Sequence, residues 1–256
     1  MGILKVNDSM PKWIFYNNEQ VKELYFNNEL VYTNYLSLFS YTGEYVVDGD
    51  LAGDFEISFL TSGTFKILRE FEYPSLFEAF IVAGGMPGGD GDGTGGKGGA
   101  GGGYNTITHI GFLHNVEYEF KIGNSGESTY IYANAGYKYE VASGDGAPGG
   151  SYISAQLRGT DGKIGVGKFN SASSDADRLF GGGGGGGGRR AGGNGQSGGG
   201  DGGNGLTSDN LNGKPGAANT GGGGGGGGWT KTGSVTEVGK GGAGGSGIVI
   251  LRNRRS

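Results

Sequence analysis

The chain has 256 residues, of which 64 are glycine, and its formal net charge is −5. Glycine makes up about 7% of ordinary proteins, and hydrophobic residues account for only 34% of this sequence. The absence of any run of about 20 apolar residues excludes a membrane-spanning helix. Five prolines without a sustained Gly-X-Y period exclude a collagen triple helix.

Side chains that usually carry chemistry are scarce. Cysteine is absent, so the chain has no disulfide, thiolate metal site or cysteine nucleophile, and the only histidines are His109 and His114. The acidic balance argues against a nucleic-acid partner, because such proteins neutralise phosphates with excess cations. We therefore expect no cofactor, no metal and no catalytic residue. Residues 1–11 lack a basic start followed by an apolar stretch, so no secretory signal peptide is expected.

Residues 1–35 form a separate N-terminal segment. Two similar stretches, 15–21 and 25–31, each place aromatic and β-branched residues on both sides of an Asn-Asn pair. Asparagine tolerates the left-handed conformation that tight hairpin turns need. The pattern predicts a small β-hairpin module that is too small to be stable alone and therefore docks on something.

The remainder, 36–256, combines strands with glycine tracts. Aromatic and β-branched residues alternate with polar ones at 55–59, 65–67, 77–82 and 117–122, as in half-buried strands, and further strands are expected at 129–133 and 137–141. Residues 248–251 are apolar on both faces, which predicts a central strand. The fold class is mainly β, with a sandwich-like framework over about 39–83, 104–141 and 248–251 and little or no α-helix.

Glycine tracts occupy 84–103, 144–150, 181–228 and 239–247, and the stretches 181–188 and 221–228 are unbroken octets. One reading is flexible coil, because ordering each backbone unit costs about 1–2 kcal/mol and glycine offers no apolar surface in return. The other is packed polyglycine II helices, each with three residues per turn and outward-pointing amides that bond to neighbouring rods. An octet would then span about 25 Å. Strands run directly into the tracts and serine is nearly absent from the purest ones, so we predict the ordered form.

Two motifs support a family resemblance: the opening at 55–65, which contains Thr61-Ser62-Gly63-Thr64-Phe65, and the closing stretch 241–252, which ends Gly-Ser-Gly-Ile-Val-Ile-Leu-Arg. Over about residues 40–252 the chain resembles the glycine-rich domain of tail proteins from bacteriophages and phage-tail-like bacteriocins. It is also similar to the distal tail-fibre adhesins of T-even-like phages, in which a layered polyglycine II array carries receptor-contacting loops. The β-rich 40–141 region departs from those adhesins. The resemblance implies a virion or particle component that cell lysis releases.

Several motifs have simpler explanations than a site. Residues 91–97 nearly match a phosphate-binding loop, but Gly98 stands where a hydroxyl residue would hold magnesium. Residues 199–207 resemble a single calcium-binding nonapeptide, a motif that works only in stacked tandem copies. The carboxylate pairs Asp48/Asp50 and Asp175/Asp177 lie in polar, turn-like contexts.

The segments between glycine blocks carry the candidate binding residues. Their amide, guanidinium and indole groups suit sugar hydroxyls or the polar rim of a surface protein. For Trp229 the alternative is a packing role over a neighbouring layer. The candidate receptor-binding residues are Arg189, Arg190, Asn194, Gln196, Asp209, Asn210, Asn212, Lys214, Trp229 and Lys231. The candidate particle-attachment residues are Trp13, Phe15, Tyr16, Tyr25, Phe26 and Tyr32.

The expected function is that of a non-enzymatic tail-tip adhesin that binds a bacterial surface protein or glycan. Its N-terminal module would contact other tail or baseplate proteins, without nucleic acid and without membrane insertion. One alternative is a structural baseplate or tail component that only bridges other tail proteins. A weaker one is a surface-polysaccharide depolymerase, because glycoside hydrolysis needs only a suitably spaced pair of carboxylates.

Overall fold

The computed structural model describes residues 15–16, 19–20, 23–26, 29–33, 38–49, 55–68, 77–132, 138–170, 178–206 and 210–253, with backbone only for 15–33 and for 170. The fold is mainly β, as predicted. In the described residues the helical elements are short 3-10 turns such as η2 (Ser154–Gln156) and η3 (Lys168–Asn170), and no helix there is long and apolar enough to cross a membrane.

The N-terminal segment forms two hairpins. Strand β1 (Phe15–Tyr16) pairs with β2 (Glu19–Gln20), and β3 (Glu23–Phe26) pairs with β4 (Glu29–Thr33), all antiparallel. Each pair flanks an Asn-Asn dipeptide, so the predicted hairpins are confirmed. Trp13 and the side chains of the other candidate attachment residues lie outside the described part.

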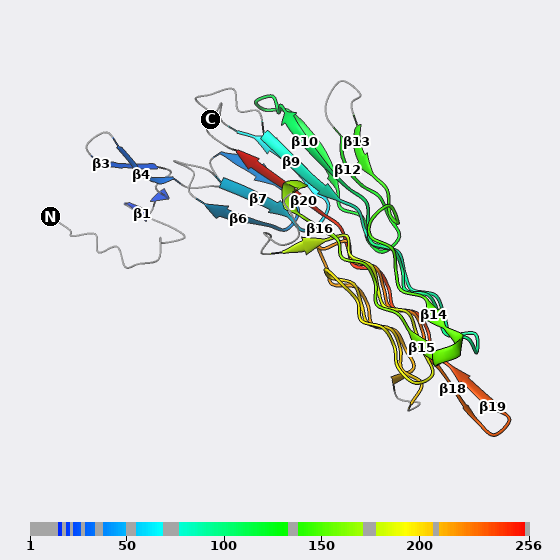
Figure 1. Cartoon of the computed structure of the whole chain (residues 1–256). Coiled ribbons are helices and arrows are strands. Elements are labelled where there is room, and N and C mark those ends of the chain that lie inside the picture. The colour runs from blue at the N-terminus through cyan, green and yellow to red at the C-terminus, as the bar shows by residue number, and fades with distance from the viewer. Residues whose placement is uncertain are drawn as a thin grey trace.

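Two antiparallel five-stranded sheets form a sandwich (Figure 1). The first has the order β10 (Tyr104–Ile110), β9 (Phe77–Val82), β20 (Ile248–Asn253), β7 (Phe55–Phe59) and β6 (Tyr45–Gly49). The second has the order β13 (Lys138–Val141), β12 (Thr129–Tyr132), β11 (Glu117–Lys121), β8 (Gly63–Ile67) and β5 (Phe39–Tyr41). The strands predicted at 55–59, 65–67, 77–82, 117–122, 129–133 and 137–141 are confirmed in the described residues, to within two residues at their ends.

Aromatic residues fill the space between the sheets. Phe59 and Phe120 belong to opposite sheets, and their ring centroids lie 4.8 Å apart, edge to face. The alternation of apolar and polar residues in β7 matches the burial of its side chains, because Phe55, Ile57 and Phe59 are buried and the residues between them are half-buried. Buried aromatic rings remove large apolar areas from water, so they stabilise the core of a chain that has few other apolar residues.

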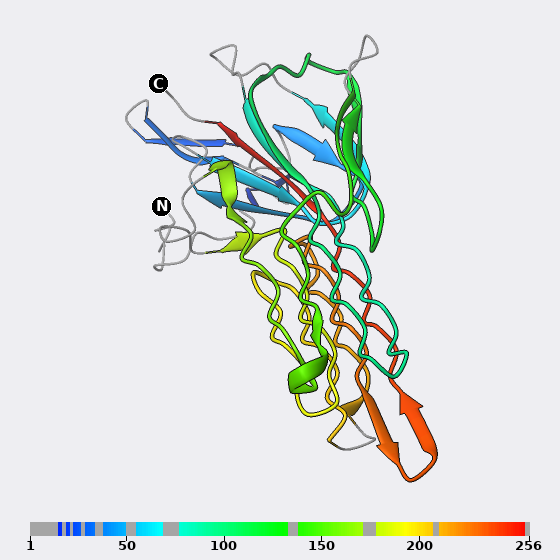
Figure 2. The same ribbon diagram turned by 45° about the vertical axis from the view of Figure 1, so that its right-hand side comes forward.

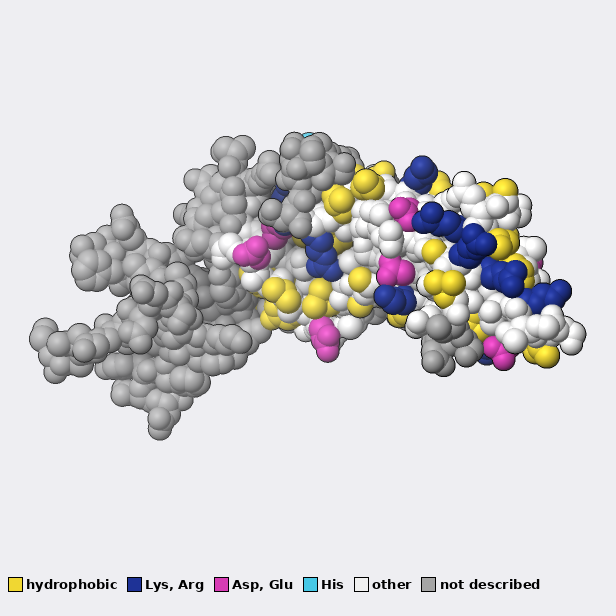
Figure 3. All heavy atoms as spheres, turned by 60° about the horizontal axis from the view of Figure 1, so that its bottom comes forward, with side chains coloured by type: hydrophobic (Ala, Val, Ile, Leu, Met, Phe, Trp, Pro, Cys, Tyr) yellow, Lys and Arg dark blue, Asp and Glu magenta, His cyan; other side chains and the backbone are white. Residues whose placement is uncertain are grey.

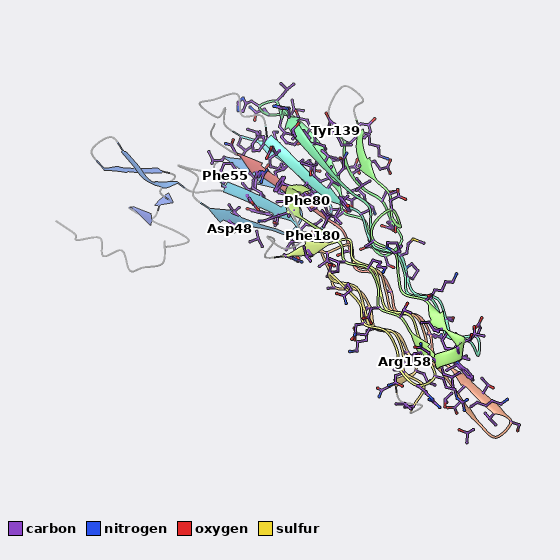
Figure 4. All side chains as sticks on the ribbon, viewed as in Figure 1. Asp48, Phe55, Phe80, Tyr139, Arg158 and Phe180 are labelled. Carbon is purple, nitrogen blue, oxygen red and sulfur yellow. The ribbon has the colours of Figure 1, made fainter. Side chains whose placement is uncertain are left out.

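The outer face of the first sheet is also covered. Phe80 and Ile250 lie under Phe180, whose ring centroid is 5.4 Å from that of Phe80 (Figure 4). Phe180 belongs to β17 (Leu179–Phe180), which pairs with β16 (Val166–Gly167). Strand β20 is therefore buried on both faces between β9 and β7, as its unbroken apolar run predicted.

The glycine tracts are ordered and form a shaft that extends from one end of the sandwich (Figure 2). We call each extended segment of the shaft a rod. Rods run outward from β9, β13 and β17 and return into β10 and β20, so strand pairing fixes their positions. The rods are 83–92, 95–103, 142–151, 159–165, 181–188, 191–197, 198–205, 211–217, 221–228 and 239–247.

Rod 181–188 bonds to its neighbours with a period of three, as expected for a helix with three residues per turn. Its successive amides donate in turn to rods 159–165, 95–103 and 198–205, and the cycle then repeats. The donor–acceptor pairs are Gly183–Lys163, Gly184–Gly99, Gly185–Gly200, Gly186–Thr160, Gly187–Gly96 and Gly188–Gly203, at 2.8–3.0 Å. Its carbonyl groups accept from rods 142–151, 221–228 and 191–197 with the same period. The rod is therefore enclosed on all sides by other rods.

Rod 221–228 is enclosed in the same way. It donates to rods 181–188, 83–92 and 211–217 and accepts from rods 95–103, 239–247 and 198–205. A Cβ atom added at any glycine of either octet would meet another backbone segment, and at Gly221 also a valine side chain, at distances that require a shift. Gly181 and Gly221, which begin the octets, also have φ values of 65° and 64°, which disfavour any other residue. Full enclosure is why both octets are pure glycine.

Outer rods keep side chains where no neighbour lies. In rod 239–247 the non-glycine residues are Lys240, Ala243 and Ser246, one per turn, and rod 95–103 shows the same spacing with Lys97 and Ala100. Rods with fewer neighbours, such as 159–165, keep only one glycine per turn. Glycine content therefore reports how much of each rod is enclosed.

Candidate functional site

The shaft ends, away from the sandwich, in a group of loops that we call the distal end (Figure 1). Its loops join rods whose interior positions hold only glycine, so side chains that could recognise a partner concentrate here. The loops are 92–95, 151–158, 189–191, 205–211 and 229–238. Loop 151–158 has β14 (Tyr152–Ile153) near its start and β15 (Arg158–Gly159) at its end, and residues 207–209 of loop 205–211 lie outside the described part.

The longest of these loops is a hairpin. Strand β18 (Trp229–Thr232) pairs with β19 (Val235–Val238) around Gly233-Ser234, where Gly233 has a φ of 62°. Trp229 lies opposite Val238 and Lys231 lies opposite Thr236, so these residues share one face, while Glu237 lies on the other.

Hydrogen bonds tie the distal loops together. The amides of Arg189 and Arg190 both donate to the carbonyl oxygen of Leu157, at 3.0 and 2.8 Å. The guanidinium of Arg189 lies over the ring of Trp229, 5.2 Å from its centroid, and donates to the carbonyl oxygen of Lys231 at 3.4 Å. Stacking of this kind contributes about 0.5–1 kcal/mol at an exposed site, and it holds the hairpin against loop 189–191.

The structure brings some of the candidate receptor-binding residues together. Arg189, Arg190, Trp229 and Lys231 lie at the distal end, and the carbonyl oxygen of Asn210 accepts there from the amide of Asn204 at 2.7 Å. Asp209 lies outside the described residues. The Trp229 indole nitrogen is buried and has no hydrogen-bond partner among the described atoms.

Other candidates lie along the shaft and complete its hydrogen bonding. The backbone amide of Asn194 donates to Asp161 Oδ1 at 2.7 Å. Asn212 Oδ1 accepts from the backbone amide of Lys240 at 2.8 Å. Lys214 forms an ion pair with Asp201 at 2.9 Å. Gln196 bonds to Gly183 and so lies near the sandwich, away from the distal end.

Several contacts of the outer rods share one principle. Where an outer rod lacks a neighbour, a side-chain oxygen of an adjacent segment takes the place of the missing carbonyl group and satisfies the amide. In two further examples, the amide of Gly241 donates to Asp90 Oδ1 at 2.8 Å and the amide of Gly244 donates to the hydroxyl oxygen of Ser125 at 2.8 Å.

Sequence reasoning missed several distal residues. Ile153, Leu206, Val235 and Val238 are 38%, 67%, 60% and 50% exposed, and Arg158 also lies here (Figure 4). A usable signal was the set of β-branched residues on both sides of Gly233-Ser234, a dipeptide typical of two-residue hairpin turns. Leu206 and Ile153 carry no comparable signal, because lone apolar residues in loops are common.

The motifs with simpler explanations have structural roles. Asp92, within the phosphate-loop-like stretch, accepts from the hydroxyl and the amide of Thr94, and these bonds lower the pKa of Asp92. Asp201, within the nonapeptide-like stretch, is paired with Lys214. The described residues contain no group of three or more His, Asp or Glu side chains that could hold a metal ion. His114 Nε2 lies 3.0 Å from the carbonyl oxygen of Leu68.

No protein-family model matches this chain, and neither does any curated protein.

Proposed function

We propose that the chain is a non-enzymatic adhesin at the tip of a phage tail or phage-tail-like bacteriocin, which binds a bacterial surface component through its distal end. The observation that carries this proposal is that the shaft has two chemically different parts, an interior and a distal end. Its interior is glycine, whereas exposed apolar and cationic side chains gather on the loops at its end.

The rigid shaft favours binding by these loops. Both ends of each distal loop are fixed by rods that are hydrogen-bonded along their length. Loops held in this way lose less conformational freedom when a partner binds, which improves affinity without adding contacts. Short loops on a rigid scaffold are a common arrangement for recognition.

The N-terminal module would attach the protein to its particle. The chain enters the sandwich through β5, so residues 1–35 are connected at the end opposite the distal loops. Trp13, Phe15, Tyr16, Tyr25, Phe26 and Tyr32 would contact other tail or baseplate proteins, and the protein would reach the outside of the cell as part of a particle.

Binding of the labelled full-length chain to a panel of bacterial strains tests this proposal. Replacing Val235 and Val238 with serine should abolish binding to any strain that the unaltered chain binds. The matched control is Val46→Ser, which changes an exposed valine on the sandwich. Equal loss in the control, or no loss in the distal variant, would contradict the proposal.

The same experiment addresses the alternatives. A purely structural tail component would bind no strain yet assemble with tail proteins, and a depolymerase would release reducing ends from surface polysaccharide.

A further inference from the structure

Cationic side chains from separate loops gather at the distal end. Arg158 is joined to loop 189–191 by a parallel bridge to Ala191, and Arg189 contacts both Trp229 and Lys231 of the hairpin. Figure 3, which turns the bottom of the molecule toward the viewer, shows Lys and Arg side chains in a row at this end of the shaft. The whole chain has a net charge of −5, so this concentration of cations runs against its overall balance.

These cations are available for a ligand. Within the described part of the chain, no carboxylate lies within ion-pair distance of Arg158, Arg189, Arg190 or Lys231. Among the acidic groups nearby that the structure describes, Asp92 binds Thr94, and Glu237 lies on the opposite face of the hairpin from Lys231. Arg158 and Arg190 are exposed.

We propose that this cluster binds phosphate groups of a bacterial surface glycan, an inference that rests on the proposed adhesin function. Guanidinium groups present paired N–H donors that match phosphate oxygens, and such charge-assisted bonds are stronger than neutral ones. Two features prepare the site: Arg189 is held on the Trp229 ring, and Leu157 fixes the backbone of Arg189 and Arg190.

A glycan fits this surface better than other polyanions. The hairpin face beside the cations carries the exposed Thr236, whose hydroxyl suits sugar hydroxyls. Nucleic acid is disfavoured, because its density of phosphates would face a chain with a net charge of −5.

The test measures binding of the full-length chain to two phosphate-bearing probes, lipopolysaccharide core oligosaccharide and poly(glycerol phosphate). The double variant Arg158→Gln/Arg190→Gln should weaken binding by about tenfold or more, since each charge-assisted bond contributes at least that factor. Lys163→Gln is the matched control, because Lys163 is exposed on the shaft away from the distal end. Its affinity should be unchanged, and enzymatic dephosphorylation of the oligosaccharide should reduce binding of the unaltered chain.

The proposal is overturned if neither probe binds, if dephosphorylation has no effect, if Lys163→Gln loses as much affinity as the double variant, or if the chain prefers polyglutamate. Whole-cell binding measured in parallel separates the two levels of inference. Cells bound through a phosphate-independent contact would overturn this inference and leave the adhesin function intact, whereas failure to bind any cell would overturn both.

Discussion

The amide of Gly226 donates to the carbonyl oxygen of Gly185 at 2.8 Å, so the two glycine octets of the chain bind each other directly. The amide of Gly223 makes the same contact with Gly182 one turn earlier, at 2.9 Å. Because every side of both octets faces other backbone, the centre of the shaft is held by backbone hydrogen bonds and close packing without apolar side chains. Its stability therefore depends on the absence of Cβ atoms.

Replacing Gly185 with alanine should strongly destabilise the protein. The added Cβ would overlap the backbone of Gly193 in the neighbouring rod, and that backbone cannot move without breaking its own hydrogen bonds. Overpacking of this kind costs about 1–3 kcal/mol or more. Thermal unfolding followed by circular dichroism should show a clearly lower midpoint.

Gly111→Ala is the control for this prediction. A Cβ at Gly111 would meet no atom within 4 Å, and its φ is not positive. Stability should be unchanged or slightly higher, because alanine restricts the unfolded chain. Equal effects of the two substitutions would show that enclosure of the octet does not set the cost.

Side-chain oxygens at the edge of the shaft should contribute measurably to stability. Asp161→Ala removes the acceptor for the amide of Asn194 and should cost about 0.5–1 kcal/mol in the free energy of unfolding, the net value of one such bond. Asp161→Asn keeps an acceptor oxygen and should restore most of that loss in urea denaturation. An asparagine variant as unstable as the alanine variant would rule out this role.

The Asp201–Lys214 pair predicts a small dependence of stability on pH. The hydrogen bond from Lys214 is the largest effect that lowers the pKa of Asp201, and the amide of Gly195 adds to it. The folded pKa of Asp201 lies below the ordinary value of 3.8. The contribution of the pair to the free energy of unfolding is therefore fully present above pH 3.8 and is lost as the pH falls through the folded pKa. The side chains of Lys214 and Asp201 are 72% and 43% exposed, so solvent screening should keep the effect below about 1 kcal/mol. Unfolding of the unaltered chain and of Asp201→Asn should therefore differ near neutral pH and converge in acid; a constant difference would contradict this prediction.

Trp229 should have a packing role that does not need its indole nitrogen. Trp229→Phe keeps a ring under Arg189 and removes a buried donor without a partner among the described atoms, so stability should change little. Trp229→Ala removes the ring and should expose the β18–β19 amides to faster hydrogen exchange. If phenylalanine frays the hairpin as much as alanine does, the nitrogen has a partner that this account lacks.

Much of the fold could be predicted from the sequence. The alternation at Phe55–Phe59 and the apolar run at Ile248–Leu251 report burial directly, because each side chain there faces a core. The spacing of Lys240, Ala243 and Ser246 also marks the open side of an outer rod, a signal that the prediction of rods did not use.

The order of the rods and the composition of the distal end could not be predicted. Contacts between glycine rods use only backbone groups, which are the same at every position, so nothing in 181–188 specifies 95–103 as its neighbour. The distal cluster depends on that order, since Arg158 and Lys231 meet Arg189 only because of how the rods pack. Gln196, close to Arg190 in sequence, lies near the sandwich for the same reason.

Amide hydrogen exchange in residues 181–188 and 221–228 tests the ordered shaft most directly. Both octets are buried, and their amides are bonded to neighbouring rods or to the carbonyl or hydroxyl oxygen of Thr220; the amide of Gly182 is the one exception, for which no bond is described. Exchange should therefore be as slow in these glycines as in β9 and β20 of the sandwich core. Exchange at the rate of an unstructured peptide, while β9 and β20 stay protected, would show that the glycine tracts are coil and would contradict the account of the shaft and its distal end.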